Sequence, residues 1–134
     1  MEKIKAYTDL EQSKKLAEIL PLESADMCWI QIYDENHMMS DHRVELIPFR
    51  FYSGIGVPCW SLAALLQVLP LGIYDEFDNC DYELEIDMID KMPRYIRLGD
   101  IYHSKFPYDF EKDTLLDNVV ESIIWLNDNN YFEL

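Results

Sequence analysis

Cys59 is the residue whose neighbours most resemble those of a reactive centre. It follows Gly54 and Gly56 in the stretch GIGVPCW and precedes an apolar run that ends at Pro70. A helix N-terminus lowers the pKa of a thiol, so a helix beginning here would make Cys59 a candidate nucleophile for a small hydrolase. A nucleophile also needs a general base, and all three histidines lie far from Cys59 in the sequence. The alternative interpretation is that Cys59 packs in the core.

The same stretch invites comparison with a phosphate-binding loop. The GxGxxG pattern requires a third glycine where Cys59 stands, and a P-loop requires a lysine that is absent here. We therefore predict no nucleotide cofactor, and we interpret Gly54 and Gly56 as turn residues with positive φ.

Imidazole and carboxylate groups gather in the loop ENHMMSDH, which holds His37 and His42. Such groups bind zinc and similar metals, so this loop offers an alternative, metal-assisted enzyme. The two histidines are five positions apart, however, and no helical HExxH pattern orients them. The acidic segment after Tyr74 likewise lacks the D-x-D-x-D-G spacing of a calcium loop. The sequence therefore predicts no metal ion.

Negative charge is the strongest feature of the composition. The chain has a formal net charge of -15 over 134 residues, and residues 75–134 alone hold 16 acids and 5 bases, a net of -11. This potential disfavours direct binding of nucleic acid and of anionic membranes, and it favours a protein partner with a basic surface. Acidic surfaces also keep proteins soluble, and that is the alternative interpretation.

One strand should display this charge on a single face. In YELEIDM, residues Tyr82, Leu84, Ile86 and Met88 alternate with Glu83, Glu85 and Asp87. Alternate side chains of a strand point to opposite faces, so an apolar face in the core forces the three acids outward. Their spacing of about 6.6 Å is close to that of phosphates along a nucleic-acid strand. We predict Glu83, Glu85 and Asp87 as a partner-binding acidic face.

The remaining elements should form one globular domain over residues 1–134. We expect a helix capped by Thr8 and Glu11 and ended by Pro21, a helix from the GIG turn to Pro70, and a last helix from residue 113 or 114 to Leu126. Strands are expected at residues 27–34, 43–51, 82–88 and 94–102. The fold class is therefore α+β, with about three helices packed on a mainly antiparallel sheet of about four strands.

The cellular setting is inferred from the cysteines and from hydropathy. Cys28, Cys59 and Cys80 are odd in number and far apart, which predicts free thiols in a cytoplasmic protein. The N-terminal segment lacks the apolar core of a signal peptide. The longest strictly apolar run near Trp60, residues 62–66, is far shorter than the ~20 residues of a membrane span.

Three blocks of the chain carry a resemblance, and they are residues 11–29 (EQSKKLAEILPLESADMCW), 57–70 (VPCWSLAALLQVLP) and 117–126 (DNVVESIIWL). Together they resemble a group of small uncharacterised Bacteroidetes proteins associated with prophages and other mobile elements. The resemblance implies a bacterial or phage protein inside the cell, and it brings no activity, cofactor or catalytic residue with it. Alanine is usual in that group at the position of Cys59, which argues against a nucleophile there.

These observations favour a non-enzymatic interaction protein, an accessory or regulatory factor of a phage or mobile element that binds a basic protein surface. One alternative is a small hydrolase or metal-assisted enzyme that uses Cys59 or the His37/His42 loop. The other is a structural component of a phage particle or complex.

Overall fold

The structure is a computed structural model that describes residues 4–33, 35–36, 38–46, 56–97, 100–104, 110 and 112–132. The α+β class is confirmed. The described residues form two antiparallel sheets, of three and four strands, with three α-helices. This is more strands than the sequence predicted, and they lie in two sheets instead of one. The chain divides into two compact units, one spanning Ala6–Leu66 and the other holding the chain from Gln67 onward together with Lys5.

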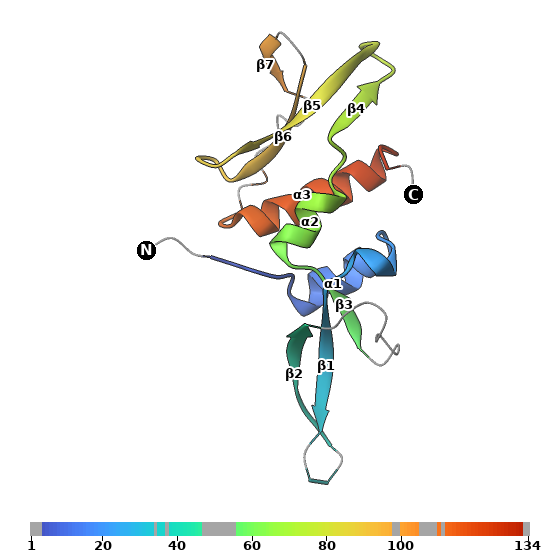
Figure 1. The fold of residues 1–134 in the computed structure, drawn as a ribbon, viewed down its shortest axis with the longest axis vertical. Helices are drawn as coiled ribbons and strands as arrows, with labels where there is room; N and C mark the ends of the chain where they lie inside the picture. Colours follow the sequence, from blue (N-terminus) through green and yellow to red (C-terminus); the bar gives the residue numbers. More distant parts are fainter. Residues whose placement is uncertain are drawn as a thin grey trace. The chain divides into compact units, whose positions relative to one another are not determined.

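The first unit is built around a long β-hairpin. Strand β1 (Met27–Tyr33) lies between β2 (Met39–Leu46) and β3 (Val57–Cys59), and both neighbours are antiparallel to it (Figure 1). Helix α1 (Leu10–Ala17) packs against β3, and a short 3₁₀ helix, η1 (Leu22–Ser24), leads into β1.

Two boundaries in this unit differ from the prediction. Strand β2 begins at Met39, so half of the predicted polar loop is strand, and the predicted strand end at residues 47–51 lies outside the described residues. Val57–Cys59 forms the edge strand β3, and helix α2 (Leu62–Val68) begins only after Ser61. Periodicity could not reveal β3, because three residues are too few to show a pattern.

Gly56 owes its identity to a close approach and not to a turn with positive φ. A Cβ atom added to Gly56 would lie 2.3 Å from Cys28 Sγ and 2.4 Å from the carbonyl oxygen of Trp29. Both neighbours belong to β1, and they leave no room for any side chain here. The predicted positive φ at Gly56 is therefore wrong, and Gly54 lies outside the described residues.

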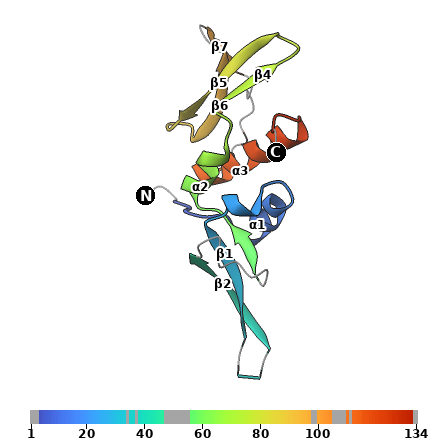
Figure 2. The ribbon, with the colours of Figure 1, turned by 45° about the vertical axis from the view of Figure 1, so that its right-hand side comes forward.

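The second unit is a four-stranded meander with a helix beside it. The strands β4 (Gly72–Asp75), β5 (Cys80–Asp87), β6 (Met92–Arg97) and β7 (Asp100–Ser104) follow one another in sheet order (Figures 1 and 2). Helix α3 (Leu115–Asp128) contacts β6. The predicted apolar stripe of this helix consists of Leu116, Val119, Val120, Ile123 and Ile124, and it is buried except at Ile124, which is half-buried. Leu126 is buried as well.

The acidic segment from Tyr74 to Asp81, which we expected to be a loop, includes the end of β4 and the start of β5. Gly72–Asp75 pairs with β5, and residues 76–79 form the turn between them, with Asn79 at φ 52. The single return strand predicted at residues 94–102 is instead two strands, β6 and β7. Residues 98–99, between these two strands, lie outside the described residues.

Asn118 ties the turn between β5 and β6 to helix α3. Its buried side-chain nitrogen donates to the carbonyl oxygens of Lys91 at 2.7 Å and Lys112 at 3.3 Å. Its side-chain oxygen accepts from the Lys112 N–H. A buried amide that satisfies both chain segments fixes their distance from the helix, because an unpaired buried polar group is unfavourable. Asn118 thereby helps to hold the sheet that carries the predicted acidic face.

We predict that Gly56→Ala destabilises the protein by about 3 kcal/mol, the upper range for overpacking a well-packed core. The added methyl group meets a backbone carbonyl that cannot rotate away. Urea unfolding at neutral pH would measure the difference.

Gly72→Ala is the matched control for this substitution. A Cβ at Gly72 comes no closer than 3.2 Å, to the carbonyl oxygen of Tyr82, so its effect should stay below about 1 kcal/mol. Equal effects of the two substitutions would contradict the close-approach explanation for Gly56.

Candidate partner-binding site

The three predicted acidic residues all lie on β5, on the face away from the buried side chains of that strand. Tyr82 is buried, Leu84 and Ile86 are half-buried, and Glu83 and Glu85 are exposed. Met88, predicted to join the apolar face, is 68% exposed because β5 ends at Asp87 and the chain turns there.

Asp81 extends the exposed acids by one position at the start of β5. Asp81, Glu83 and Glu85 are three successive outward positions on the strand, and all three are exposed. We call these three residues the acidic stripe. Sequence reasoning missed Asp81 because the predicted strand began at Tyr82. The alternation of acidic and apolar residues extends back to Asp81, so the sequence pattern could have included this residue in the predicted acidic face.

The side chains opposite the acidic stripe do not neutralise it. Glu83 pairs across the ladder with Ile96, and Glu85 pairs with Arg94. The Arg94 guanidinium turns to other partners, at 2.8 Å from an Asp90 oxygen and 3.4 Å from an Asp87 oxygen. Within the part of the chain that the structure describes, no ion pair reaches Glu83 or Glu85.

Asp87 differs from the two glutamates because the turn after β5 uses its carboxylate. Its Oδ1 accepts the backbone N–H of Ile89 at 2.9 Å and that of Asp90 at 3.1 Å. These backbone hydrogen bonds, Asp90 first, hold the pKa of Asp87 below its usual value, and the Arg94 charge adds to the effect. Asp87 is a turn residue, half-buried and already paired, and so contributes less free charge than the stripe.

More acids lie in the turn between β4 and β5. Glu76 and Asp78 are exposed there, and Asp78 accepts a hydrogen bond of 2.7 Å from the Tyr82 hydroxyl. This bond to a carboxylate raises the pKa of Tyr82 and anchors the buried tyrosine to the turn.

The hairpin Gly72–Asp87 carries seven acids and no base. Asp75 is buried, and Arg94, opposite Glu85, pairs with Asp87. The other acids of the hairpin are exposed and can attract cations and basic groups.

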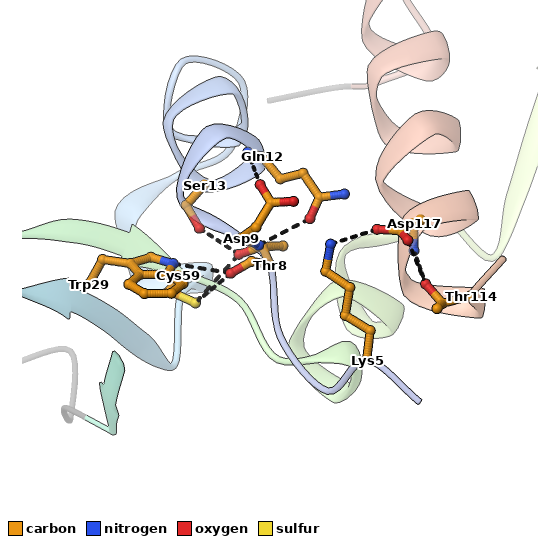
Figure 3. Close-up of polar contacts among 9 residues, drawn as sticks. All are labelled: Lys5, Thr8, Asp9, Gln12, Ser13, Trp29, Cys59, Thr114 and Asp117. Carbon is orange, nitrogen blue, oxygen red and sulfur yellow. Dashed lines mark hydrogen bonds and ion pairs between the residues drawn. The ribbon is translucent and has the colours of Figure 1, made fainter. Parts of the chain in front are cut away.

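Cys59 lies in a closed polar network of the first unit, which Figure 3 shows. Its side chain is fully buried, and its Sγ lies 3.4 Å from both the hydroxyl and the carbonyl oxygen of Thr8. Thr8 in turn meets the Ser13 hydroxyl at 2.6 Å and accepts the Trp60 N–H at 3.2 Å. Burial raises the pKa of Cys59, which is the opposite of the shift that a nucleophile requires.

The helix expected to activate Cys59 does not begin at Cys59. Ser61 precedes α2, and its hydroxyl accepts the Ala64 N–H at 3.1 Å. Asp26 accepts both the backbone N–H of Ser61, at 2.8 Å, and its hydroxyl. Cys59 lies in β3, outside the helix, so the structure removes the basis of the nucleophile hypothesis.

Thr8 also has a different role from the predicted one. Asp9 caps helix α1, accepting the Gln12 N–H at 2.8 Å, while the Gln12 side chain accepts the Asp9 N–H at 3.1 Å (Figure 3). The predicted capping box at Thr8 and Glu11 is therefore displaced by one residue. A second cap in Figure 3 belongs to the other unit, where Thr114 and Asp117 begin α3 and Lys5 pairs with Asp117 at 2.8 Å.

The histidine hypothesis falls largely outside the described side chains. His37 lies outside the described residues, and His42 stands opposite Gln31 in the β1–β2 ladder. Among the described residues, no three His, Cys, Asp or Glu side chains lie together in a group that could hold a metal ion.

The described helices include none with the length and apolar character needed to cross a membrane. Comparison with protein-family models, with curated proteins and with solved structures found nothing that matches this chain.

Cys28, Cys59 and Cys80 are all free thiols in the structure, as predicted, but they differ in burial. We predict that Cys80 reacts first with a thiol reagent, and that Cys28 and Cys59 react at least about a hundredfold more slowly, because they need local opening of the fold. Mass spectrometry of the labelled native protein would give the three rates. Cys80→Ser should remove the fast phase, and labelling of Cys59 as fast as Cys80 would contradict the burial described here.

We also predict that Asp87→Asn loses more stability at neutral pH than in acid. The folded pKa of Asp87 is lowered, so its contribution is complete above the unfolded value of about 3.9 and disappears as the pH falls through the folded pKa. Urea midpoints at pH 7 and at about pH 3 would measure this. The difference between the urea midpoints of the wild type and the variant should become smaller in acid.

Glu85→Gln serves as the control, because it removes a charge from the same strand without touching the turn. The urea midpoint of this variant should differ little from that of the wild type at both pH values. An Asp87→Asn effect that does not change with pH would show that the carboxylate charge is irrelevant to the turn.

Proposed function

We propose that this protein is a non-enzymatic interaction protein that binds a basic surface of a protein partner through β5. The single observation that carries the proposal is the acidic stripe of Asp81, Glu83 and Glu85, exposed on one face. Asp87 lies at the end of this surface, where its carboxylate is 3.4 Å from the Arg94 guanidinium.

Electrostatics supports a protein partner over the other classes of ligand. A surface of one negative sign repels phosphate backbones and anionic lipids, and it speeds encounters with positive surfaces. Complementary charge acts mainly on the rate of encounter and on the choice of partner, so an exposed acidic stripe favours positive surfaces over others.

The resemblance of the three sequence blocks extends the proposal to a setting. We infer an accessory or regulatory factor of a phage or mobile element, acting inside a bacterial cell, whose partner is a basic protein such as a DNA-binding protein. Neighbouring residues of the stripe are two positions apart on the strand and so spaced by about 6.6 Å, which suits a partner surface that normally meets phosphates.

Other functions have less support from the described residues. Cys59 is buried with a raised pKa, and this leaves the hydrolase alternative without its nucleophile. The structural-component alternative requires stable self-association, which the charge of the hairpin opposes.

Reversing two stripe residues tests the proposal. We predict that Glu83→Lys with Glu85→Lys weakens binding of the basic partner at least about tenfold while the urea midpoint changes little, since exposed charges contribute little to stability. The partner would be captured from a bacterial lysate with the wild-type chain, identified, purified and titrated calorimetrically at low and high salt. Wild-type binding should weaken steeply as salt rises.

The control changes net charge by the same amount at another place. Glu18 and Glu23 are exposed in the first unit, so Glu18→Lys with Glu23→Lys leaves the stripe intact. This control should change the affinity by less than about threefold, as a long-range charge would. Equal losses in the two variants would show that only net charge matters, and affinity independent of salt and of both variants would overturn the proposal.

A further inference from the structure

We propose that the partner adds an extended, basic segment to the open edge of β4, as a fifth strand beside the acidic hairpin. This inference rests on the proposed function and names the way in which the partner binds. Strand β4 is the terminal strand of the described sheet order β4-β5-β6-β7. Gly72 and Tyr74 on this strand are exposed, so the edge is accessible.

The hydrogen-bond alternation of the ladder shows which backbone groups are offered. The Leu84 N–H donates to the Leu71 carbonyl oxygen at 2.9 Å, which places Leu71 at a hydrogen-bonded position. Positions of an antiparallel ladder alternate, so Ile73 and Asp75 also bond toward β5. The N–H and C=O groups of Gly72 and Tyr74 then point to the outer edge. An added strand would find donors and acceptors already in register there.

Exposed apolar side chains lie on β4 and beside it: Leu71 precedes the strand, and Phe77 lies in the turn that follows it. Leu71 is 83% exposed, Tyr74 50% and Phe77 98%. Large apolar groups at such exposure, beside unpaired backbone groups, are typical of a surface that another chain covers. Residues 72–75 include no lysine, proline or bulge, so the protection of this edge consists of its short length and the buried Asp75.

Charge decides which chain can cover the edge. Two copies paired through β4 would bring two hairpins together, each with seven acids and no base. Like charges at such short distances repel each other, so pairing between two copies is disfavoured. A segment with lysine or arginine at alternate positions would instead place cations beside the acids of the turn and of β5 while its backbone completes the ladder. Charge complementarity therefore selects a basic extended segment.

A pair of synthetic peptides tests strand addition apart from charge. One peptide alternates lysine with threonine or valine, and the second has the same side chains with N-methyl groups on the amides that would face β4. Methylation removes ladder donors and keeps every charge. We expect the methylated peptide to bind at least about tenfold more weakly to the wild-type protein, measured by calorimetry at low salt.

Two variants of Tyr74 probe the same edge from the protein side. Tyr74→Pro removes an N–H that is not used by β5, whereas Tyr74→Ala removes the same side chain, with its hydrogen bond to Asn79, and keeps the N–H. The proline variant should bind the unmethylated peptide at least about tenfold more weakly than the alanine variant. If the proline variant fails to fold, the methylated peptide still decides the question.

The outcomes separate this inference from the function on which it rests. If both peptides bind equally and only reversal of Glu83 and Glu85 weakens them, the partner binds by charge and strand addition is overturned. If that reversal has no more effect than the charge-matched control, the acidic surface itself is excluded and both proposals fail. A dimer that dissociates on introducing Tyr74→Pro would assign the edge to a second copy and would also overturn the inference.

Discussion

The pleat of β5 is the constraint on which the acidic stripe depends. A strand sends successive side chains to opposite faces, so burial of Tyr82 on one side fixes Glu83 and Asp81 on the other. A shift of one residue in the pairing would bury carboxylates, which costs far more than the sheet could recover. The core of the second unit thus determines the acidic surface. Asp78, which accepts the Tyr82 hydroxyl, and Asn118, which ties the next turn to α3, keep that register in place.

Close packing plays the corresponding part in the first unit. Gly56 lets the chain enter β3 against Cys28 and Trp29 without a side chain between them. Cys59 and Trp60 follow at once and are fully buried. Packing therefore explains the stretch that most resembled a reactive centre. Gly56 is needed because no side chain fits at its position, and the Cys59 thiol is buried and hydrogen-bonded to Thr8. The polar groups around Cys59 satisfy one another, and this is what a buried polar cluster requires.

The sequence predicted the features that repeat over many residues. In β5 the alternation runs over several residue pairs, from Tyr82 to Asp87, and in α3 the apolar stripe runs over several turns. The sides of both elements that face the core were therefore predictable. Strands β3 and β4 have three and four residues, and neither can show a period. Asp9 and not Thr8 caps helix α1, because the Thr8 hydroxyl is hydrogen-bonded to Cys59, which lies 51 positions away in the sequence. This contact could not be predicted from neighbouring residues. Likewise, no local pattern shows that the β5–β6 turn engages Asp87 and Arg94.

The negative charge of the β4–β5 hairpin affects which chains can pair with the exposed edge of β4. An edge strand flanked by exposed apolar residues such as Leu71 and Phe77 favours pairing with copies of itself. Seven acids without a base within Gly72–Asp87 oppose that pairing without any change to the edge itself. Protection by charge differs from protection by proline or a bulge, because it blocks only partners of the same sign. A hairpin of this composition repels its own copies, and the same charge is what favours the basic partner that we propose.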